Sequence, residues 1–208
     1  MRLLGALPQK DSLRVAFKQK RLALSSEERA SIDAAIAQRV FELSEFRDAQ
    51  LVATYLSFGA EVETRGIIER AWQEGKTVAL PRCLPASRRM RWYALDSFDE
   101  LKRHAFGMLE PVENPAQEVD LALQGNALAI VPALAIDMQG FRLGYGGGYY
   151  DAFLADFPGV SIGLCREAQV VENLAALGAR ERYDIPVDLV ITETRLLRAR
   201  RGDEPFTA

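Results

Sequence analysis

The chain has 208 residues, of which 49% are hydrophobic and 26% charged, and its formal net charge is −3. These values are typical of one globular domain and exclude a disordered or fibrous chain. The acidic balance also excludes a general attraction to nucleic acid or anionic membranes, which needs a surplus of Lys and Arg. We therefore expect small molecules as partners, with any anion site confined to a local patch.

Helices and strands alternate along the chain according to its apolar periodicity. Ser25 and Glu28 form a capping-box pattern that begins the second helix, and Thr64 is expected to cap the third. The strand at residues 90–95 is weaker and predicts an edge strand or a hairpin arm. The predicted helices cover residues 10–24, 25–43, 64–75 and 149–154, and the predicted strands cover residues 51–56, 77–80, 90–95, 127–131, 160–164 and 189–192.

These elements predict an α/β fold. Strand, helix and strand within about thirty residues are typical of a βαβ crossover, which makes the central sheet at least partly parallel. No linker divides the chain, so we expect a single domain over residues 1–208 with a folded catalytic core at residues 10–193. Residues 194–208 carry arginines followed by Gly, Asp, Glu and Pro, and predict a solvated, flexible tail.

Cysteine and histidine usage narrows the chemistry. Cys83 and Cys165 lie beside predicted strands and are interpreted as buried reduced thiols, and the only histidine is His104. These residues exclude a disulfide framework and argue against Cys/His or Ser/His catalysis. The N-terminal apolar stretch is too short for an export signal, and residues 121–136 are too short for a membrane span. We expect a soluble, cytoplasmic monomer.

The strongest local pattern is residues 140–151, with the sequence GFRLGYGGGYYD. Its glycines would let backbone N–H groups and a helix N-terminus converge on phosphate oxygens. The pattern is neither a P-loop nor the dinucleotide fingerprint, and on composition alone a tight surface turn explains it equally well. Arg142 and Asp151 favour the anion site, because they put a cation and a carboxylate suited to magnesium at its two ends.

Other charged residues indicate a binding site only in combination with this loop. Asp184 and Asp188 frame the start of the last strand, although an Asp before X-Pro is usually a turn residue. Glu61, Glu63 and Arg82 follow two predicted strands, at the edge where open α/β sheets bind ligands. Four basic residues recur at steps of four, four and three and would share one face of the first helix; they are Lys10, Arg14, Lys18 and Arg21. The simpler interpretation of this basic stripe is a helix face exposed to solvent.

Taken together, these segments resemble the 5-formyltetrahydrofolate cyclo-ligase family, also called methenyltetrahydrofolate synthetases. The loop followed by Tyr-Tyr-Asp is the most specific part of the resemblance. It implies a three-layer α/β/α fold with a largely parallel central sheet, similar to the NagB/RpiA/CoA transferase-like fold. The matching segments, in the family's order, are residues 10–14, 24–29, 55–64, 75–82, 131–137, 140–151 and 184–188.

The resemblance implies ATP-dependent cyclisation of 5-formyltetrahydrofolate to 5,10-methenyltetrahydrofolate, with Mg²⁺ as cofactor and release of ADP and phosphate. Phosphorylation of the formyl oxygen would make the formyl carbon electrophilic and turn its oxygen into a leaving group. The neighbouring nitrogen would then close the ring. Such a transfer needs positioning and charge neutralisation rather than a protein nucleophile.

The family pattern also implies roles for individual residues. ATP would be bound by Lys10, Arg14, Arg142, Leu143, Gly144, Tyr145, Gly146, Gly147, Gly148, Tyr149 and Tyr150. The folate would contact Leu56, Glu61, Tyr145, Gly146, Gly147, Gly148 and Tyr149. Magnesium would bind Asp151 and Asp184, and the catalytic residues would be Arg142, Tyr149 and Asp151. Arg82 is added as an ATP ligand on its position and charge alone.

Two departures from the family keep alternatives open. Some members carry basic side chains where this chain has Tyr145 and Gly147, so the cation at the transferring phosphoryl would be Arg142 or Arg82. Many have histidine where this chain has Tyr183, which bears on how Asp184 is oriented. A non-catalytic nucleotide- or folate-binding relative therefore remains an alternative. So does an ATP-independent isomerase of similar fold, with Glu61 as its base.

Overall fold

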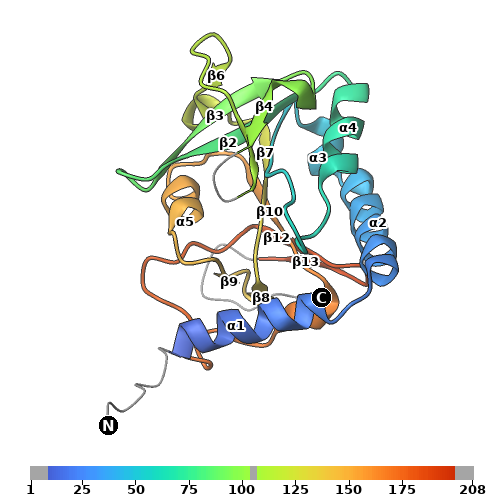
Figure 1. The fold of residues 1–208 in the computed structure, drawn as a ribbon, viewed down its shortest axis with the longest axis vertical. Helices are drawn as coiled ribbons and strands as arrows, with labels where there is room; N and C mark the ends of the chain where they lie inside the picture. The colour runs from blue at the N-terminus through green and yellow to red at the C-terminus, as the bar shows by residue number, and fades with distance from the viewer. Residues whose placement is uncertain (1–8, 104–106, 200–208) are drawn as a thin grey trace.

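A mixed eight-stranded sheet forms the centre of the molecule (Figure 1). The computed structural model describes residues 9–103 and 107–199, so His104 lies outside the described residues. The order of the sheet is β13-β12-β10-β7-β1-β2-β3-β6. Its strands are β1 (Leu51–Ala53), β2 (Thr77–Leu84), β3 (Arg89–Leu95), β6 (Glu118–Val119), β7 (Ala127–Val131), β10 (Val160–Leu164), β12 (Leu189–Ile191) and β13 (Leu196–Arg198).

The middle of the sheet is parallel. Strands β12, β10, β7, β1 and β2 pair in parallel, with Val52 opposite Val78 on one side and Leu128 on the other. The predicted βαβ crossover is therefore confirmed. β3 runs antiparallel to β2, which makes it a hairpin arm, and β6 pairs with its outer edge.

Helices cover the two faces of the sheet unequally. α2 (Ser26–Glu42), α3 (Ser44–Asp48) and α4 (Arg65–Gln73) pack on one face, and the short α5 (Tyr149–Leu154) packs on the other (Figure 1). Every residue of β7 is buried, as expected for a strand covered on both sides. The expected three-layer arrangement is present, with a thin second helical layer.

The predicted caps of two helices have different outcomes. Glu28 N donates to Ser25 Oγ at 3.1 Å, and Ser25 N donates to Glu28 Oε2 at 2.8 Å, which confirms the capping box of α2. Thr64 precedes α4, but its side chain does not cap that helix, so this prediction is wrong. Its Oγ1 instead donates to Tyr55 O at 2.7 Å and accepts from Ser57 N at 3.0 Å. Thr64 therefore closes the loop that follows β1.

α1 (Gln9–Leu22) lies across one end of the molecule, apart from both helical layers (Figure 1). Phe17 packs on Leu134 and Phe141, beside the small sheet of β11, β8 and β9. This sheet follows the carboxyl end of β7, so α1 covers an edge where open α/β sheets bind ligands. The remaining elements are β4 (Leu101–Arg103), β5 (Leu109–Pro111), β8 (Ala135–Asp137), β9 (Arg142–Leu143), β11 (Val170–Val171), and the 3-10 turns η1 (Phe98–Glu100), η2 (Leu121–Leu123) and η3 (Glu167–Gln169).

The sheet extends beyond the predicted folded core. Residues 196–198, which we expected in a flexible tail, form β13 and pair antiparallel with β12. Leu197 is fully buried, so the expected boundary at residue 193 is wrong for this strand. Residues 200–208 of the expected tail lie outside the described residues. Across residues 9–103 and 107–199, no helix is both long and apolar enough to cross a bilayer.

Gly159, just before β10, packs too tightly for any side chain. A Cβ there would lie 2.2 Å from Ala127 O and 2.6 Å from Phe157 Cζ. We expect Gly159→Ala to lower the free energy of unfolding by about 3 kcal/mol, because a backbone carbonyl cannot move aside without disturbing β7. Urea denaturation measures this loss. The matched control is Gly125→Ala, where a Cβ meets nothing within 4 Å and stability should be unchanged.

Candidate active site

The glycine-rich segment leaves a tight hairpin and enters α5. Asp137 Oδ1 accepts from Gln139 N at 2.9 Å and from Phe141 N at 3.0 Å, which closes the turn between β8 and β9. Beyond β9, Gly146 has a φ of 102°, and Gly148, the N-cap of α5, has a φ of 71°. Residues with a side chain rarely adopt such angles, so glycine is required at both positions. The predicted order of strand, glycine loop and helix is confirmed.

Arg14 of α1 reaches this loop, and Lys10 of the same helix reaches Asp184. Arg14 Nε donates to Gly144 O at 3.0 Å, and a Cβ at Gly146 would lie 3.3 Å from Arg14 Cζ. A side chain at residue 146 would crowd the guanidinium, so glycine lets Arg14 lie close to the loop backbone. Lys10 Nζ lies 3.5 Å from Asp184 Oδ2. The structure therefore brings the predicted residues Lys10, Arg14 and Asp184 to the same end of the molecule.

Arg142 and Asp151 form an ion pair behind the loop. Arg142 Nη2 donates to Asp151 Oδ1 at 2.9 Å, and Arg142 Nη1 donates to Ile185 O at 2.6 Å. Ile185 N donates to the same Asp151 oxygen at 3.1 Å. Burial lowers the pKa of the Arg142 guanidinium, and the Asp151 carboxylate opposes that shift. Arg142 holds Asp151 in place, while its direct contact with a phosphate stays a prediction.

Asp151 and Asp184 are the predicted magnesium ligands. Asp184 precedes Ile185, whose N–H binds Asp151, and the charges of both carboxylates raise the pKa of Arg142. Asp151 accepts its two hydrogen bonds on Oδ1, which leaves Oδ2 outside them. Two carboxylates suit a magnesium ion that takes its other ligands from phosphates and water. Within the part of the chain that the structure describes, no three His, Cys, Asp or Glu side chains form a cage for a metal on their own.

Glu61 lies in the loop after β1 and faces Tyr145 of the glycine loop. Burial, the charge of Glu61 and a hydrogen bond to its side chain raise the pKa of the Tyr145 hydroxyl. Arg21 Nη1 donates to the same hydroxyl at 2.9 Å and opposes the shift. Burial and the Glu61 charge also raise the pKa values of Tyr55 and Tyr150. The predicted substrate residue Glu61 therefore lies among tyrosines and close to a buried cation.

Tyr149 and Leu56 are two further predicted site residues. The Tyr149 ring packs against Gly147, where a Cβ would come within 2.6 Å of Tyr149 Cδ2. Leu56 lines a pocket of about 230 Å³ together with Ser57 and Phe58, which belong to the loop that carries Glu61. Contact of either residue with a substrate stays a prediction.

Arg82 is the predicted residue that the structure does not bring to the glycine loop. Its Nη1 donates to Pro111 O at 2.9 Å, and its Nε lies 3.3 Å from Glu113 Oε1. The role of Arg82 as an ATP ligand stays a prediction. Cys83 is half-buried rather than buried, whereas Cys165 is buried as expected.

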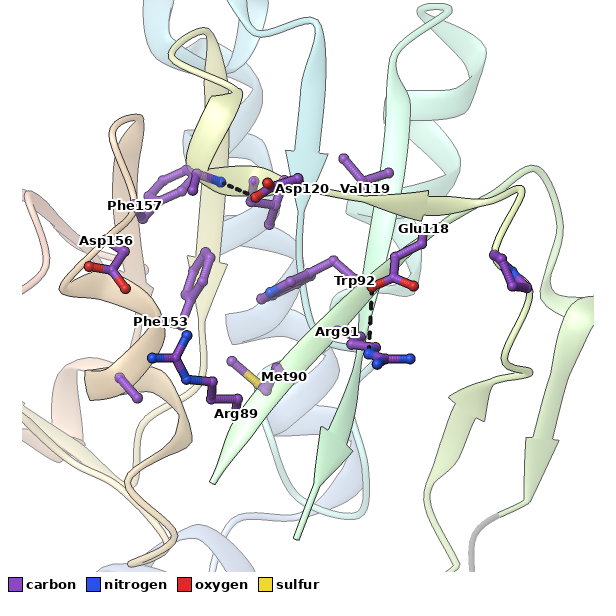
Figure 2. Close-up of a pocket in the computed structure, with 14 residues that line it drawn as sticks. Arg89, Met90, Arg91, Trp92, Glu118, Val119, Asp120, Phe153, Asp156 and Phe157 are labelled. Atoms are coloured by element: carbon purple, nitrogen blue, oxygen red, sulfur yellow. Dashed lines mark hydrogen bonds and ion pairs between the residues drawn. The ribbon is translucent and has the colours of Figure 1, made fainter. Parts of the chain in front are cut away.

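A larger pocket lies away from the glycine loop (Figure 2). It has a volume of about 490 Å³ between β3, residues 118–122 and α5, and none of the predicted site residues lines it. Trp92 packs on Phe153 with ring centroids 4.8 Å apart, and among the described residues its buried Nε1 has no hydrogen-bond partner. Acidic and basic side chains occur together on the rim, where Arg91 pairs with Glu118. This mixed lining favours no single class of ligand.

The sequence pattern missed residues that support the site from behind. Arg21 belongs to the basic stripe of α1, yet it is only 4% exposed, and its Nη2 donates to Ala133 O. The stripe was a signal that could have identified it. Arg166 and Asp33 pair across 133 residues of sequence and carry no local signal of a shared role.

Comparison with known proteins identifies the family of this chain. The model of the 5-formyltetrahydrofolate cyclo-ligase family matches residues 6–193. Proteins named 5-formyltetrahydrofolate cyclo-ligase from Haemophilus influenzae and Mus musculus are 31% and 34% identical over 86% of this chain, covering 95% and 87% of their own lengths. The structure of Aquifex aeolicus 5,10-methenyltetrahydrofolate synthetase has a TM-score of 0.79 at 32% identity, covering 95% of this chain and 96% of that one. This chain therefore belongs to the 5-formyltetrahydrofolate cyclo-ligase family.

Proposed function

We propose that this protein uses ATP to convert 5-formyltetrahydrofolate to 5,10-methenyltetrahydrofolate, with release of ADP and phosphate. The observation that carries the proposal is the glycine loop, which has Arg14 above its backbone at Gly146 and the Arg142–Asp151 pair behind it. Family membership supports the folate substrate and the ring closure. The backbone cradle and its cation support the nucleotide.

The reaction must activate a formamide, which is a poor electrophile. Transfer of the γ-phosphoryl group to the formyl oxygen breaks the bond between that phosphorus and the bridging oxygen of ADP. The neighbouring folate N–H nitrogen then attacks the formyl carbon and loses its proton to water or phosphate, and phosphate leaves with the former formyl oxygen. Positioning and charge neutralisation dominate the catalysis of such transfers, so the proposal requires no protein nucleophile.

The residues divide between the two substrates. Arg14, Lys10 and the loop residues 142–150 would hold the triphosphate; the contact of Arg14 with Gly144 O and the place of Lys10 beside Asp184 support this. Glu61, from the loop after β1, and Tyr145, from the glycine loop, would meet the polar edge of the folate ring. The cluster around Tyr145 thus joins the two halves of the site, because this tyrosine belongs to the glycine loop and faces Glu61.

Magnesium is part of the proposal. Asp151 and Asp184 would hold the ion, which would supply charge neutralisation at the phosphates. Arg142 and the Ile185 N–H orient the Asp151 carboxylate, and both of their hydrogen bonds end on the same carboxylate oxygen, Oδ1. The cytoplasmic location and the monomeric state remain predictions.

One assay separates the proposed activity from the alternatives. Purified protein is incubated with 5-formyltetrahydrofolate, Mg²⁺ and ATP, while the near-ultraviolet absorbance of the methenyl product and the release of ADP are followed. We expect product only when ATP is present, with ADP and product in equal amounts. Folate binding without product would indicate a non-catalytic relative. Turnover that does not depend on ATP would indicate a different class of enzyme.

A further inference from the structure

A buried ion pair lies beneath the loop that carries Glu61. Arg166 follows β10, and Asp33 belongs to α2. Arg166 Nε donates to Asp33 Oδ1 at 2.8 Å, and Arg166 Nη2 donates to Asp33 Oδ2 at 2.7 Å. The two side chains are only 1% and 6% exposed. This is a bidentate pair removed from water, where both charges depend on each other.

The remaining hydrogen bonds of this pair all go to the backbone around Glu61. Arg166 Nη1 donates to Ala60 O at 3.0 Å, and Arg166 Nη2 donates to Glu61 O at 3.0 Å. From the other side, Glu63 N donates to Asp33 Oδ2 at 3.1 Å. The pair therefore holds the backbone at three positions of the loop between β1 and α4, residues 60 and 61 through Arg166 and residue 63 through Asp33.

A purely structural role does not account for this choice of residues. A buried ion pair can usually be replaced by apolar side chains of similar volume without loss of stability, so burial alone does not call for charges. Apolar side chains, however, cannot bind the carbonyl oxygens of residues 60 and 61. The distinctive contribution of the pair is the fixed backbone beneath Glu61.

We propose that Arg166 and Asp33 are positioning residues, which fix the backbone of residues 60–63 so that the Glu61 carboxylate meets the reduced folate. The inference rests on the proposed function, since it names what orients one of its substrate residues. The pair itself does not touch substrate. Its removal should weaken folate use and leave ATP use unchanged, because Arg14 and the glycine loop lie on other elements.

The test is the double variant Asp33→Leu/Arg166→Met, which removes both charges and keeps the volume. We expect a Tm within about 5 °C of wild type. The KM for 5-formyltetrahydrofolate should rise about tenfold or more, because small misplacements of a binding group are costly. The KM for ATP should stay within about twofold of wild type, since the nucleotide cradle is not altered. Hydrogen exchange at the Glu63 amide should become faster.

Matched variants keep the test decisive. Arg195→Met breaks a comparable bidentate pair, Arg195 to Glu167 at 3.2 and 2.6 Å, and should leave the folate KM unchanged. Arg166→Lys keeps the charge but loses the fork, and should raise the folate KM even if the double variant does not fold. A wild-type folate KM in Arg166→Lys and in any folded double variant would overturn the inference. Wild-type protein without ATP-dependent product would overturn the proposed function itself, and the inference with it.

Discussion

Asp151→Asn should raise the Mg²⁺ concentration needed for half-maximal activity about tenfold and lower kcat about 100-fold. Asparagine has the shape of aspartate and can still accept from Arg142 Nη2 and Ile185 N, so the loop should keep its position. What disappears is the negative charge that would bind the metal. Initial rates measured across a Mg²⁺ titration at saturating ATP and folate give both quantities.

The same substitution also leaves the Arg142 guanidinium without its counter-charge. That side chain is almost fully buried, so we expect unfolding to become easier by about 1–3 kcal/mol. Thermal denaturation separates this loss from the catalytic effect. The control is Asp156→Asn, an exposed carboxylate just after α5, which should change neither stability nor the Mg²⁺ requirement. An unchanged Mg²⁺ requirement in Asp151→Asn would remove Asp151 from the metal site.

Local patterns account for most of the fold. The capping box joins Ser25 and Glu28, which are only three residues apart in sequence. The burial of β7 follows from the uninterrupted run of apolar residues within the strand itself. The βαβ spacing also determines that β1 and β2 are parallel, because a crossover of that length returns the chain in the same direction. These features were predictable because each depends on neighbours in sequence.

The misses depend on contacts that sequence spacing does not show. β13 is ordered because Leu197 is buried beside β12, although its flanking arginines are typical of a tail. Thr64 is a residue type that often caps helices, but its hydroxyl donates to Tyr55 O, which the loop brings close to it. In each case the local sequence favours one structure, and a contact formed in the folded chain favours another.

The candidate site shows the same division. The glycine loop and Asp151 were identifiable because they form one continuous segment that ends in α5. The meeting of Glu61 and Arg21 at Tyr145 required the packing of α1 against two loops. Strand position and the family resemblance both indicated Glu61, whereas the contact of Arg21 with Tyr145 emerged only from the three-dimensional arrangement.

Glu61→Gln should raise the KM for 5-formyltetrahydrofolate about 10- to 100-fold and leave the KM for ATP unchanged. Glutamine is nearly isosteric and can still accept from Phe58 N, as Glu61 Oε2 does at 2.9 Å, so the loop should persist. The loss corresponds to one hydrogen bond to a charged group, worth about 1.5–3 kcal/mol. Steady-state kinetics with each substrate varied in turn measures both constants.

A titration of the tyrosines tests the same charge without substrate. Burial raises the pKa values of Tyr55, Tyr145 and Tyr150, and the Glu61 charge adds to each shift, because a nearby negative charge disfavours the tyrosinate. Neutral glutamine should therefore move their ionisation, followed by near-ultraviolet absorbance, to lower pH. Glu63→Gln is the control, since that side chain binds Ser57 Oγ at 2.6 Å. If both variants keep wild-type folate kinetics while the tyrosine titration shifts only in Glu61→Gln, the carboxylate is correctly placed but does not bind folate.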